Sequence, residues 1–303
     1  MAHGSSVTLS ARAKINLYLD ILSRRENGYH NILSIMQSVA LCDTVTLTAR
    51  PKGSGILVET DIPDLPTDRR NLAYRAAEKF AEVLGYTPDV LIQITKRIPM
   101  SAGLAGGSAD AAAVLRGLDL LCQTNLPQEQ LCELGAALGA DIPFCIAGGA
   151  MVTEGIGEIL TPCDGLPESQ WLVIACGGEG VSTPDAYRAL DGTHGNFAAP
   201  HAPDPRFASL KTALSAGDTA AVGANMYNIF EEIVLPTHSV AAKLIDSMQA
   251  SGASRAMMSG SGPSVFGLFA TKEMAEEAAA RIQHVLGIRA YVTHPAPQPN
   301  NEV

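Results

Sequence analysis

The segment PMSAGLAGGSAD, residues 99–110, constrains the fold of this 303-residue chain more than any other stretch of the sequence. An apolar run at 90–95 predicts a strand before it, and an alanine-rich run at 107–121 predicts a helix after it. Glycines let backbone N–H groups approach an anion closely, and the start of a helix adds unsatisfied donors with a partial positive charge. The segment therefore predicts a phosphate-binding loop, and a tight turn without a ligand is the alternative.

The common phosphate-binding patterns do not fit this loop. No Lys follows the glycines, so GxxxxGK[ST] has no match, and neither GxGxxG nor the protein-kinase signatures occur. A second glycine-rich segment, SGSGPS at 259–264, leads into a predicted strand at 264–269. We expect its backbone to face the same ligand from another part of the fold.

Composition and charge exclude several classes of partner. With 21 Lys and Arg against 31 Asp and Glu, the net charge of −10 argues against nucleic acid or an anionic membrane surface as the main partner. No apolar run is long enough to span a membrane, and the first ten residues lack the pattern of a secretion signal. The six cysteines form no CxxC pair, and the seven histidines show no metal-binding spacing. We expect a cytoplasmic protein with reduced thiols and no metal site built from its own side chains.

Two blocks of mixed strands and helices predict an α+β chain with two domains, residues 1–165 and 166–303. In the first block, alternation over 14–22 predicts a strand with an apolar and a polar face, and Asn71 and Gly85 bracket a predicted helix. Other elements are expected at 44–48 and 127–138, and the second block should hold strands at 171–175, 264–269 and 289–293 and helices at 208–215, 238–251 and 273–286. The polar stretch 191–206, rich in Pro, His and Gly, is expected to be a long loop.

Two charged residues stand in positions suited to catalysis. Lys14 lies on the polar face of the strand predicted at 14–22, and Asp141 lies between apolar neighbours in LGADIPF. A carboxylate in such a setting needs a partner, and Lys14 is a candidate. Phosphoryl transfer needs a group that orients or deprotonates the attacking hydroxyl, which Asp141 could be. A helix-capping role for Asp141 and a solvated strand position for Lys14 are the alternatives.

Four segments resemble the motifs of the GHMP small-molecule kinases, namely ARAKINL at 11–17, the loop at 99–109, GADIP at 139–143 and GSGPS at 260–264. The resemblance runs from residue 8 to residue 293, with the motifs in the expected order. It implies a two-domain GHMP kinase fold, in which the N-terminal domain is ribosomal protein S5 domain 2-like and the C-terminal domain is ferredoxin-like. It also implies an ATP-dependent enzyme whose active site lies in the cleft between the two domains.

The same resemblance implies roles for individual residues. Asp141 would be the base or the orienting carboxylate for the accepting hydroxyl, and Lys14 would hold that hydroxyl. Asn71 and Lys96 would lie near the adenine, and Mg²⁺ is expected on the ATP phosphates with Ser108 as its candidate contact. The loop would wrap those phosphates with Pro99, Met100, Ser101, Ala102, Gly103, Leu104, Ala105, Gly106, Gly107, Ser108 and Ala109.

Within these kinases, RRENGYH at 24–30 and STP at 182–184 resemble the members whose alcohol substrate carries a cytidine diphosphate group. That resemblance implies that Tyr29 and Tyr187 stack on the pyrimidine and that His30 reads its edge. Thr183 would contact the substrate near the cytosine, and Asn16 would hydrogen-bond the substrate. An incidental Asn-Gly turn is the alternative for Tyr29 and His30.

Two other functions stay open at this point. Another GHMP kinase, such as a homoserine kinase, would not need the aromatic residues of a pyrimidine site. A non-catalytic nucleotide-binding regulator with the same fold would not need Lys14 and Asp141. In each case the expected partner is a small molecule, and the chain is expected to be a monomer or a weak homodimer.

Overall fold

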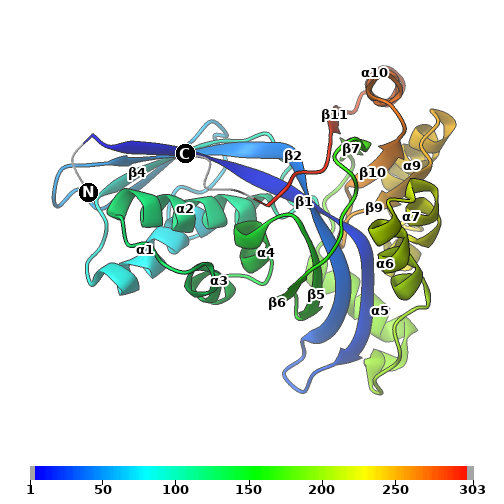
Figure 1. The fold of residues 1–303 in the computed structure, drawn as a ribbon, viewed down its shortest axis with the longest axis horizontal. Helices are drawn as coiled ribbons and strands as arrows, with labels where there is room; N and C mark the ends of the chain where they lie inside the picture. Colours follow the sequence, from blue (N-terminus) through cyan, green and yellow to red (C-terminus); the bar gives the residue numbers. More distant parts are fainter. Residues whose placement is uncertain (1–3, 299–303) are drawn as a thin grey trace.

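Two β-sheets organise the protein, whose computed structural model describes residues 4–298 (Figure 1). The larger sheet has seven strands; its central order is β3-β4-β2-β1-β8, and β5 and β6 continue from β2. These strands are β1 (Ser6–Arg24), β2 (His30–Ala49), β3 (Ile56–Thr60), β4 (Val90–Thr95), β5 (Ala150–Gly155), β6 (Ile159–Pro162) and β8 (Tyr227–Asn228). Figure 1 shows the first four helices on one face of this sheet: α1 (Leu72–Leu84), α2 (Gly106–Cys122), α3 (Gln128–Ala136) and α4 (Ile142–Ala147).

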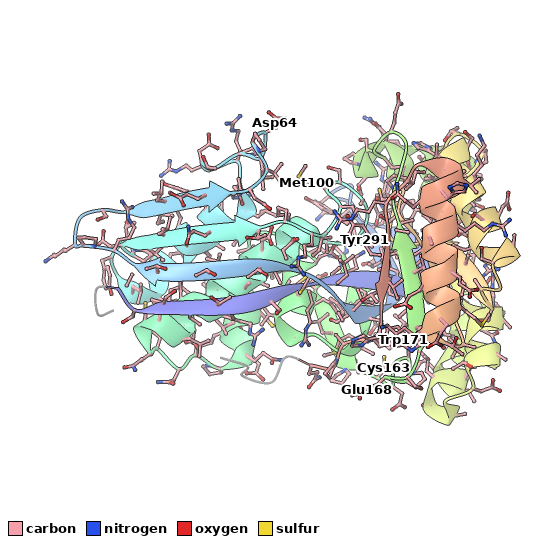
Figure 2. All side chains as sticks on the ribbon, turned by 90° about the horizontal axis from the view of Figure 1, so that it is seen from above. Asp64, Met100, Cys163, Glu168, Trp171 and Tyr291 are labelled. Atoms are coloured by element: carbon pink, nitrogen blue, oxygen red, sulfur yellow. The ribbon has the colours of Figure 1, made fainter. Side chains whose placement is uncertain are left out.

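The smaller sheet is antiparallel and has the strand order β11-β7-β10-β9. Its strands are β7 (Trp171–Ala175), β9 (Arg255–Met258), β10 (Val265–Phe269) and β11 (Ala290–Thr293). Together with α9 (Ser239–Ala250) and α10 (Lys272–Leu286) they form the β-α-β-β-α-β sequence of a ferredoxin-like domain. Figure 2 shows α10 lying along this sheet. The order of strands and helices is the expected α+β arrangement, with a ferredoxin-like sheet in the second half of the chain.

Four more helices lie between β7 and α9, namely α5 (Thr183–Thr193), α6 (Arg206–Ala216), α7 (Thr219–Asn225) and α8 (Glu231–Val234). The loop expected at 191–206 is therefore shorter, because α5 extends to Thr193 and a 3₁₀ turn covers Gly195–Phe197. No helix within residues 4–298 combines the length and the apolar character that a membrane crossing requires.

Local signals placed helix α1 correctly. The Asn71 side chain accepts a hydrogen bond from the backbone N–H of Ala73, and Gly85 closes the helix in the left-handed conformation with φ 71°. Between these caps, Ala76 and Phe80 are fully buried. The parallel pair β3 and β4, joined by α1, completes a β-α-β unit.

Strand β1 is more buried than its alternating sequence pattern predicted. Up to Ala11 the burial alternates, but from Ala13 to Ile21 both faces are buried. The expected polar face of residues 14–22 is therefore not a solvent face. Tyr18, on that face, packs against Phe207 and Tyr227 of the second half of the chain. β-Bulges in the pairing with β2 shift the register within this stretch, which re-aims its side chains.

The two halves of the chain are also joined by hydrogen bonds between strands. β8 pairs in parallel with Tyr18 and Leu19 of β1, so the second half contributes a strand to the larger sheet. The C-terminal segment returns to β2, where Ala296 N–H donates to the Ser38 carbonyl at 2.8 Å. The domain limits 1–165 and 166–303 stay a prediction.

The glycine-rich loop at 99–110 packs against the segment at 259–264 and forms hydrogen bonds with it. Ser259 Oγ donates to the Gly103 carbonyl at 3.2 Å, and Ser264 N–H donates to the Ala102 carbonyl at 3.3 Å. Gly103 has φ 74°, and a Cβ at this position would overlap the carbonyl oxygen of Ser259. Two backbones therefore meet here with no room for a side chain.

Gly103→Ala should lower the free energy of unfolding by about 2–4 kcal/mol, because left-handed strain adds to the overlap with the facing backbone. The matched control is Gly53→Ala, which has φ 85° with no atom near the added Cβ, and strain alone should cost it about 1 kcal/mol. Denaturant unfolding of both variants measures the difference. Equal losses would contradict the contact between the two loops.

Candidate active site

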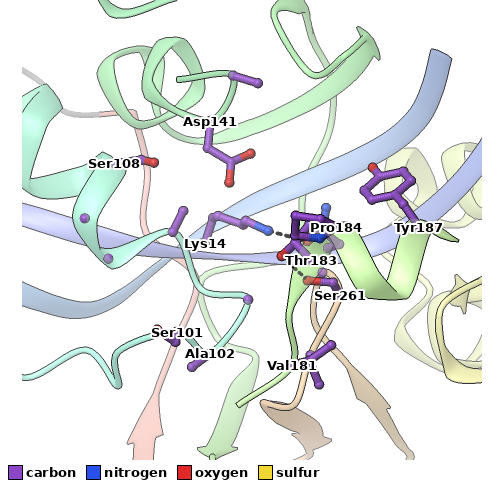
Figure 3. Close-up of a pocket in the computed structure, with 18 of the residues that line it drawn as sticks. Lys14, Ser101, Ala102, Ser108, Asp141, Val181, Thr183, Pro184, Tyr187 and Ser261 are labelled. Carbon is purple, nitrogen blue, oxygen red and sulfur yellow. Dashed lines mark hydrogen bonds between the residues drawn. The ribbon is translucent and has the colours of Figure 1, made fainter. Parts of the chain in front are cut away.

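A cleft of about 1090 Å³ lies where the two sheets meet, and both halves of the chain line it. Every residue predicted for the site lines this cleft except Leu104 and Ala109, which are buried behind it. Figure 3 shows the arrangement: Ser108 and Asp141 lie on one side, Lys14 lies on the floor, and Tyr187 lies at the far end. Figure 2 places Met100, near the start of the loop, close to the junction of the two sheets.

The glycine-rich loop offers backbone donors to the cleft. Helix α2 follows Ala105, which has φ 58° and a side chain that cannot cap a helix. The N–H groups of Gly106, Gly107 and Ser108 therefore have no partner within the helix. They combine with the helix dipole into a site for an anion, without any basic side chain in the loop.

Lys14 is held at the floor of the cleft by neighbouring groups. Its backbone N–H donates to the Leu104 carbonyl at 3.1 Å, which ties strand β1 to the glycine-rich loop. Its Nζ donates to Asn16 Oδ1 at 2.6 Å, and Asn16 Nδ2 donates in turn to Ser34 Oγ at 2.8 Å. Lys14 and Asn16 are both at least 95% buried, so neither is a solvated strand residue.

Asp141 does not form the direct ion pair with Lys14 that the sequence suggested. The residue occupies the N-cap position of α4, yet its side chain makes no capping hydrogen bond. Figure 3 shows its carboxylate directed into the cleft, on the side of Lys14. Its charge adds to the effect of burial in raising the pKa of the Tyr187 hydroxyl. Asp141 is therefore a carboxylate that can accept a proton from a bound ligand.

Lys96 lies in a buried cluster of charges beside α2. Its Nζ contacts Asp43, and it donates to Asp110 Oδ2 at 2.6 Å. Burial opposes its charge, but the two carboxylates outweigh burial and raise the pKa of Lys96. Burial raises the pKa of Asp110 to about 7, against the opposing effect of Lys96, and Asp110 Oδ1 has no hydrogen-bond partner within residues 4–298. Lys96 thus forms a fixed wall of the cleft rather than a mobile cation.

Asn71 likewise has its polar groups engaged within the protein. Its Oδ1 caps α1, and its Nδ2 donates to the Pro66 carbonyl at 2.7 Å. It lines the cleft together with the neighbouring Arg70. The structure thus brings Asn71 and Lys96 to the same cleft as the loop but gives both a structural task.

Aromatic side chains gather at the other end of the cleft. Tyr29 is 60% exposed on a turn in which its N–H donates to Asn27 Oδ1 at 3.1 Å. His30, the next residue, is buried, and its ring stacks on Tyr187 with centroids 4.8 Å apart. One face of Tyr187 is therefore covered by His30. Thr183 meets the second glycine segment, with its Oγ1 2.8 Å from Ser261 Oγ (Figure 3).

Sequence reasoning missed several charged residues of the cleft. Arg24, Arg188 and Asp191 line its aromatic end, and Arg70 lines it near α1. A signal existed for Asp191, because it stands four residues after Tyr187 and so shares a helix face with it. That signal needed α5, which the sequence analysis did not predict.

Comparisons with known proteins agree with this geometry. The sequence model described as "GHMP kinases N terminal domain" matches residues 71–149, and "GHMP kinases C terminal" matches residues 210–287. The 4-diphosphocytidyl-2-C-methyl-D-erythritol kinase of Alkaliphilus metalliredigens is 45% identical over 263 residues, which cover 87% of this chain and 88% of that protein. The enzyme of the same name from Synechococcus sp. strain JA-2-3B'a(2-13) is 43% identical over 89% of this chain and 88% of its own.

Solved structures show the same relationship. A crystal structure of 4-(cytidine 5'-diphospho)-2C-methyl-D-erythritol kinase superposes with a TM-score of 0.79 at 32% identity, covering 96% of this chain and 99% of that one. A homoserine kinase from Cytophaga hutchinsonii reaches a TM-score of 0.73 over 98% of this chain and 96% of its own, but at 19% identity it shares only the fold. Identity above 40% over nearly nine-tenths of its length, with both GHMP domains in order, shows that the chain belongs to the 4-diphosphocytidyl-2-C-methyl-D-erythritol kinase family of the GHMP kinases.

Proposed function

We propose that this protein transfers the γ-phosphate of ATP to the 2-hydroxyl of 4-diphosphocytidyl-2-C-methyl-D-erythritol, a step in the non-mevalonate synthesis of isoprenoid precursors. One observation carries the proposal. A loop of free backbone donors and a group of aromatic side chains occupy opposite ends of one cleft, with Lys14 and Asp141 between them. This order matches the order of groups in the reaction, which runs from triphosphate through alcohol to cytosine.

The triphosphate would lie against the glycine-rich loop. Gly106, Gly107 and Ser108 at the start of α2 line the cleft, so their N–H groups are available to hydrogen-bond the phosphate oxygens. The protein carries a net charge of −10, so its overall charge does not attract a triphosphate. The positive potential at the loop comes from local groups such as these backbone dipoles. The Asn71 and Lys96 side would receive the adenine.

The reaction itself would place the alcohol between Asp141 and Lys14. The hydroxyl oxygen bonds to the γ-phosphorus while the bond from that phosphorus to the β–γ bridging oxygen breaks, and ADP leaves with the bond's electrons. The hydroxyl proton passes to the Asp141 carboxylate. Lys14, held by Asn16, stabilises the negative charge of the transferred group, and Asn16 positions the substrate.

Mg²⁺ would accompany ATP, and the donors in the cleft fit this expectation. No three His, Cys, Asp or Glu side chains within residues 4–298 are grouped to hold a metal ion. Ser108 and Asp141 both line the cleft and offer oxygen atoms to it. Such a sparse set suits Mg²⁺, which keeps several waters and binds largely through phosphate oxygens. Bound to the nucleotide, the ion would neutralise phosphate charge, and Ser108 would contact it.

The compartment is part of the same proposal. All six cysteines are free thiols, and free thiols are typical of the reducing cytoplasm. We place the enzyme there.

A panel of phosphoryl acceptors tests the proposed function. With ATP and Mg²⁺, we expect turnover with 4-diphosphocytidyl-2-C-methyl-D-erythritol and less than about one-hundredth of that kcat/KM with homoserine or mevalonate, because only the first fills the aromatic end. Release of ADP measures the rate. Turnover with homoserine but not with the cytidine substrate would contradict the proposal and indicate a homoserine kinase. Nucleotide binding without turnover of any acceptor would indicate a non-catalytic regulator.

Asp141→Asn should lower kcat by about 10²- to 10⁴-fold, because an amide cannot take the hydroxyl proton. The Kd of ATP should change little, since the phosphates are bound by the loop. Asp246→Asn, on the exposed side of α9, is the control and should keep wild-type turnover. Single-turnover kinetics and calorimetry give the two quantities, and near-normal kcat in Asp141→Asn would remove this residue from the chemistry.

Tyr29→Ala should raise the KM of the cytidine substrate by about 10- to 100-fold, because one stacking partner of the base is lost. The KM of ATP should stay within about twofold of wild type, because ATP binds at the other end of the cleft. Tyr86→Ala is the matched control, since Tyr86 is 53% exposed and lies outside the cleft. Equal losses for both substrates would contradict a stacking role.

A further inference from the structure

The buried carboxylate of Asp191 has no part in the chemistry derived above. We propose that Asp191 is a positioning residue that fixes the tautomer of His30, so that Nδ1 offers a lone pair to the amino group of cytosine. The inference rests on the proposed function, because it explains how that site would distinguish a cytidine from a uridine substrate.

The hydrogen bond between the two residues sets the tautomer. His30 Nε2 lies 2.7 Å from Asp191 Oδ1, and both side chains are more than 90% buried. An ionised carboxylate only accepts hydrogen bonds, so Nε2 must carry the hydrogen. In a neutral imidazole the other nitrogen, Nδ1, is then an acceptor.

Arg24 contacts the other oxygen of the Asp191 carboxylate. Its guanidinium lies 3.4 Å from Asp191 Oδ2, the oxygen that His30 does not use. Both carboxylate oxygens are therefore engaged, one by His30 and one by Arg24, which fixes the orientation of the carboxylate toward Nε2.

The ring of His30 is also held in plane. Tyr187 stacks on it at 4.8 Å and 24°, and Phe197 meets it edge-on at 5.9 Å and 85°. With Nε2 bonded to Asp191, the ring cannot turn without losing contacts on three sides. Nδ1 has no hydrogen bond to another described residue, and His30 lines the cleft.

Helix α5 supplies two of these contacts from one face. Tyr187 and Asp191 are four residues apart, so their side chains lie one above the other on the helix. One helix therefore both stacks on His30 and bonds to it. This pairing makes the orientation of His30 depend on α5 as well as on strand β2, which His30 begins.

A fixed Nδ1 acceptor separates the two pyrimidines. Cytosine carries an amino group at position 4, which donates to the Nδ1 lone pair. Uracil carries a carbonyl oxygen there, which would place two lone pairs against each other. A buried polar group left unpaired in this way penalises the wrong substrate.

The first test reads the tautomer directly. In ¹⁵N-labelled wild-type protein without ligand, long-range ¹⁵N–¹H correlation spectra at neutral pH should show His30 protonated at Nε2 and not at Nδ1. A hydrogen on Nδ1, alone or in a doubly protonated ring, would overturn the proposal. This measurement needs no variant and no turnover, so its result is independent of the proposed function.

The second test uses variants in the acceptor assay. Asp191→Ala should raise the KM of the cytidine substrate about tenfold and reduce its preference over the uridine analogue by a similar factor, with kcat and the KM of ATP within about twofold. Asp191→Asn should recover part of the preference, since its amide oxygen can still accept from Nε2. Asp246→Ala is the control, because Asp246 is exposed on α9 and lies outside the cleft.

The outcomes separate the two proposals. An unchanged cytidine preference in Asp191→Ala, with wild-type protein active, would overturn the positioning role alone. Absence of turnover by wild type with the cytidine substrate would overturn the proposed function, and the spectra would still decide the tautomer. If Asp191→Ala does not fold, the substrate preference of Asp191→Asn and the wild-type spectra decide between the outcomes.

Discussion

The contact between two glycine-rich backbones is the constraint on which the site depends. Gly103 lies so close to Ser259 and Gly262 that no side chain fits between them. This contact fixes the glycine-rich loop relative to the second half of the chain, and the bond from Lys14 N–H to the Leu104 carbonyl carries the same alignment into strand β1. Lys14, the loop and the aromatic end are thereby held at set distances across a junction between two sheets.

Environment gives three carboxylates of the cleft different tasks. Asp110 is buried against Lys96, and burial raises its pKa to about 7. Asp191 is bound to His30 and Arg24, so its oxygens are already used. Asp141 has no capping bond and no ion pair with another described residue, and its carboxylate faces the cleft. Of the three, Asp141 is therefore the one whose carboxylate is open to a ligand, which is a consequence of its surroundings and not of its residue type.

Local signals in the sequence were reliable where one element determines its own structure. Asn71 and Gly85 bounded α1, and the run at 90–95 became β4. The burial of the polar face of β1 could not be predicted. Alternation is typical of a strand with one solvent-exposed face, whereas here the second half of the chain covers that face at Tyr18. Local patterns carry no information about such a distant partner.

In the site, too, the features set by local sequence were predicted and those set by distant contacts were not. Glycine motifs identified the loop that lines one end of the cleft, because they act through the backbone, and the resemblance to the GHMP kinases named Lys14 and Asp141. The direct Lys14–Asp141 pair was wrong, since Asn16 lies closer on the same strand. Asp191 was missed because helix α5 was not predicted. The glycine-rich end offers backbone groups that any nucleotide can engage, whereas the aromatic end offers side chains from 24–30 and 183–191. Substrate choice among kinases of this fold should therefore vary at the second end while the first stays constant.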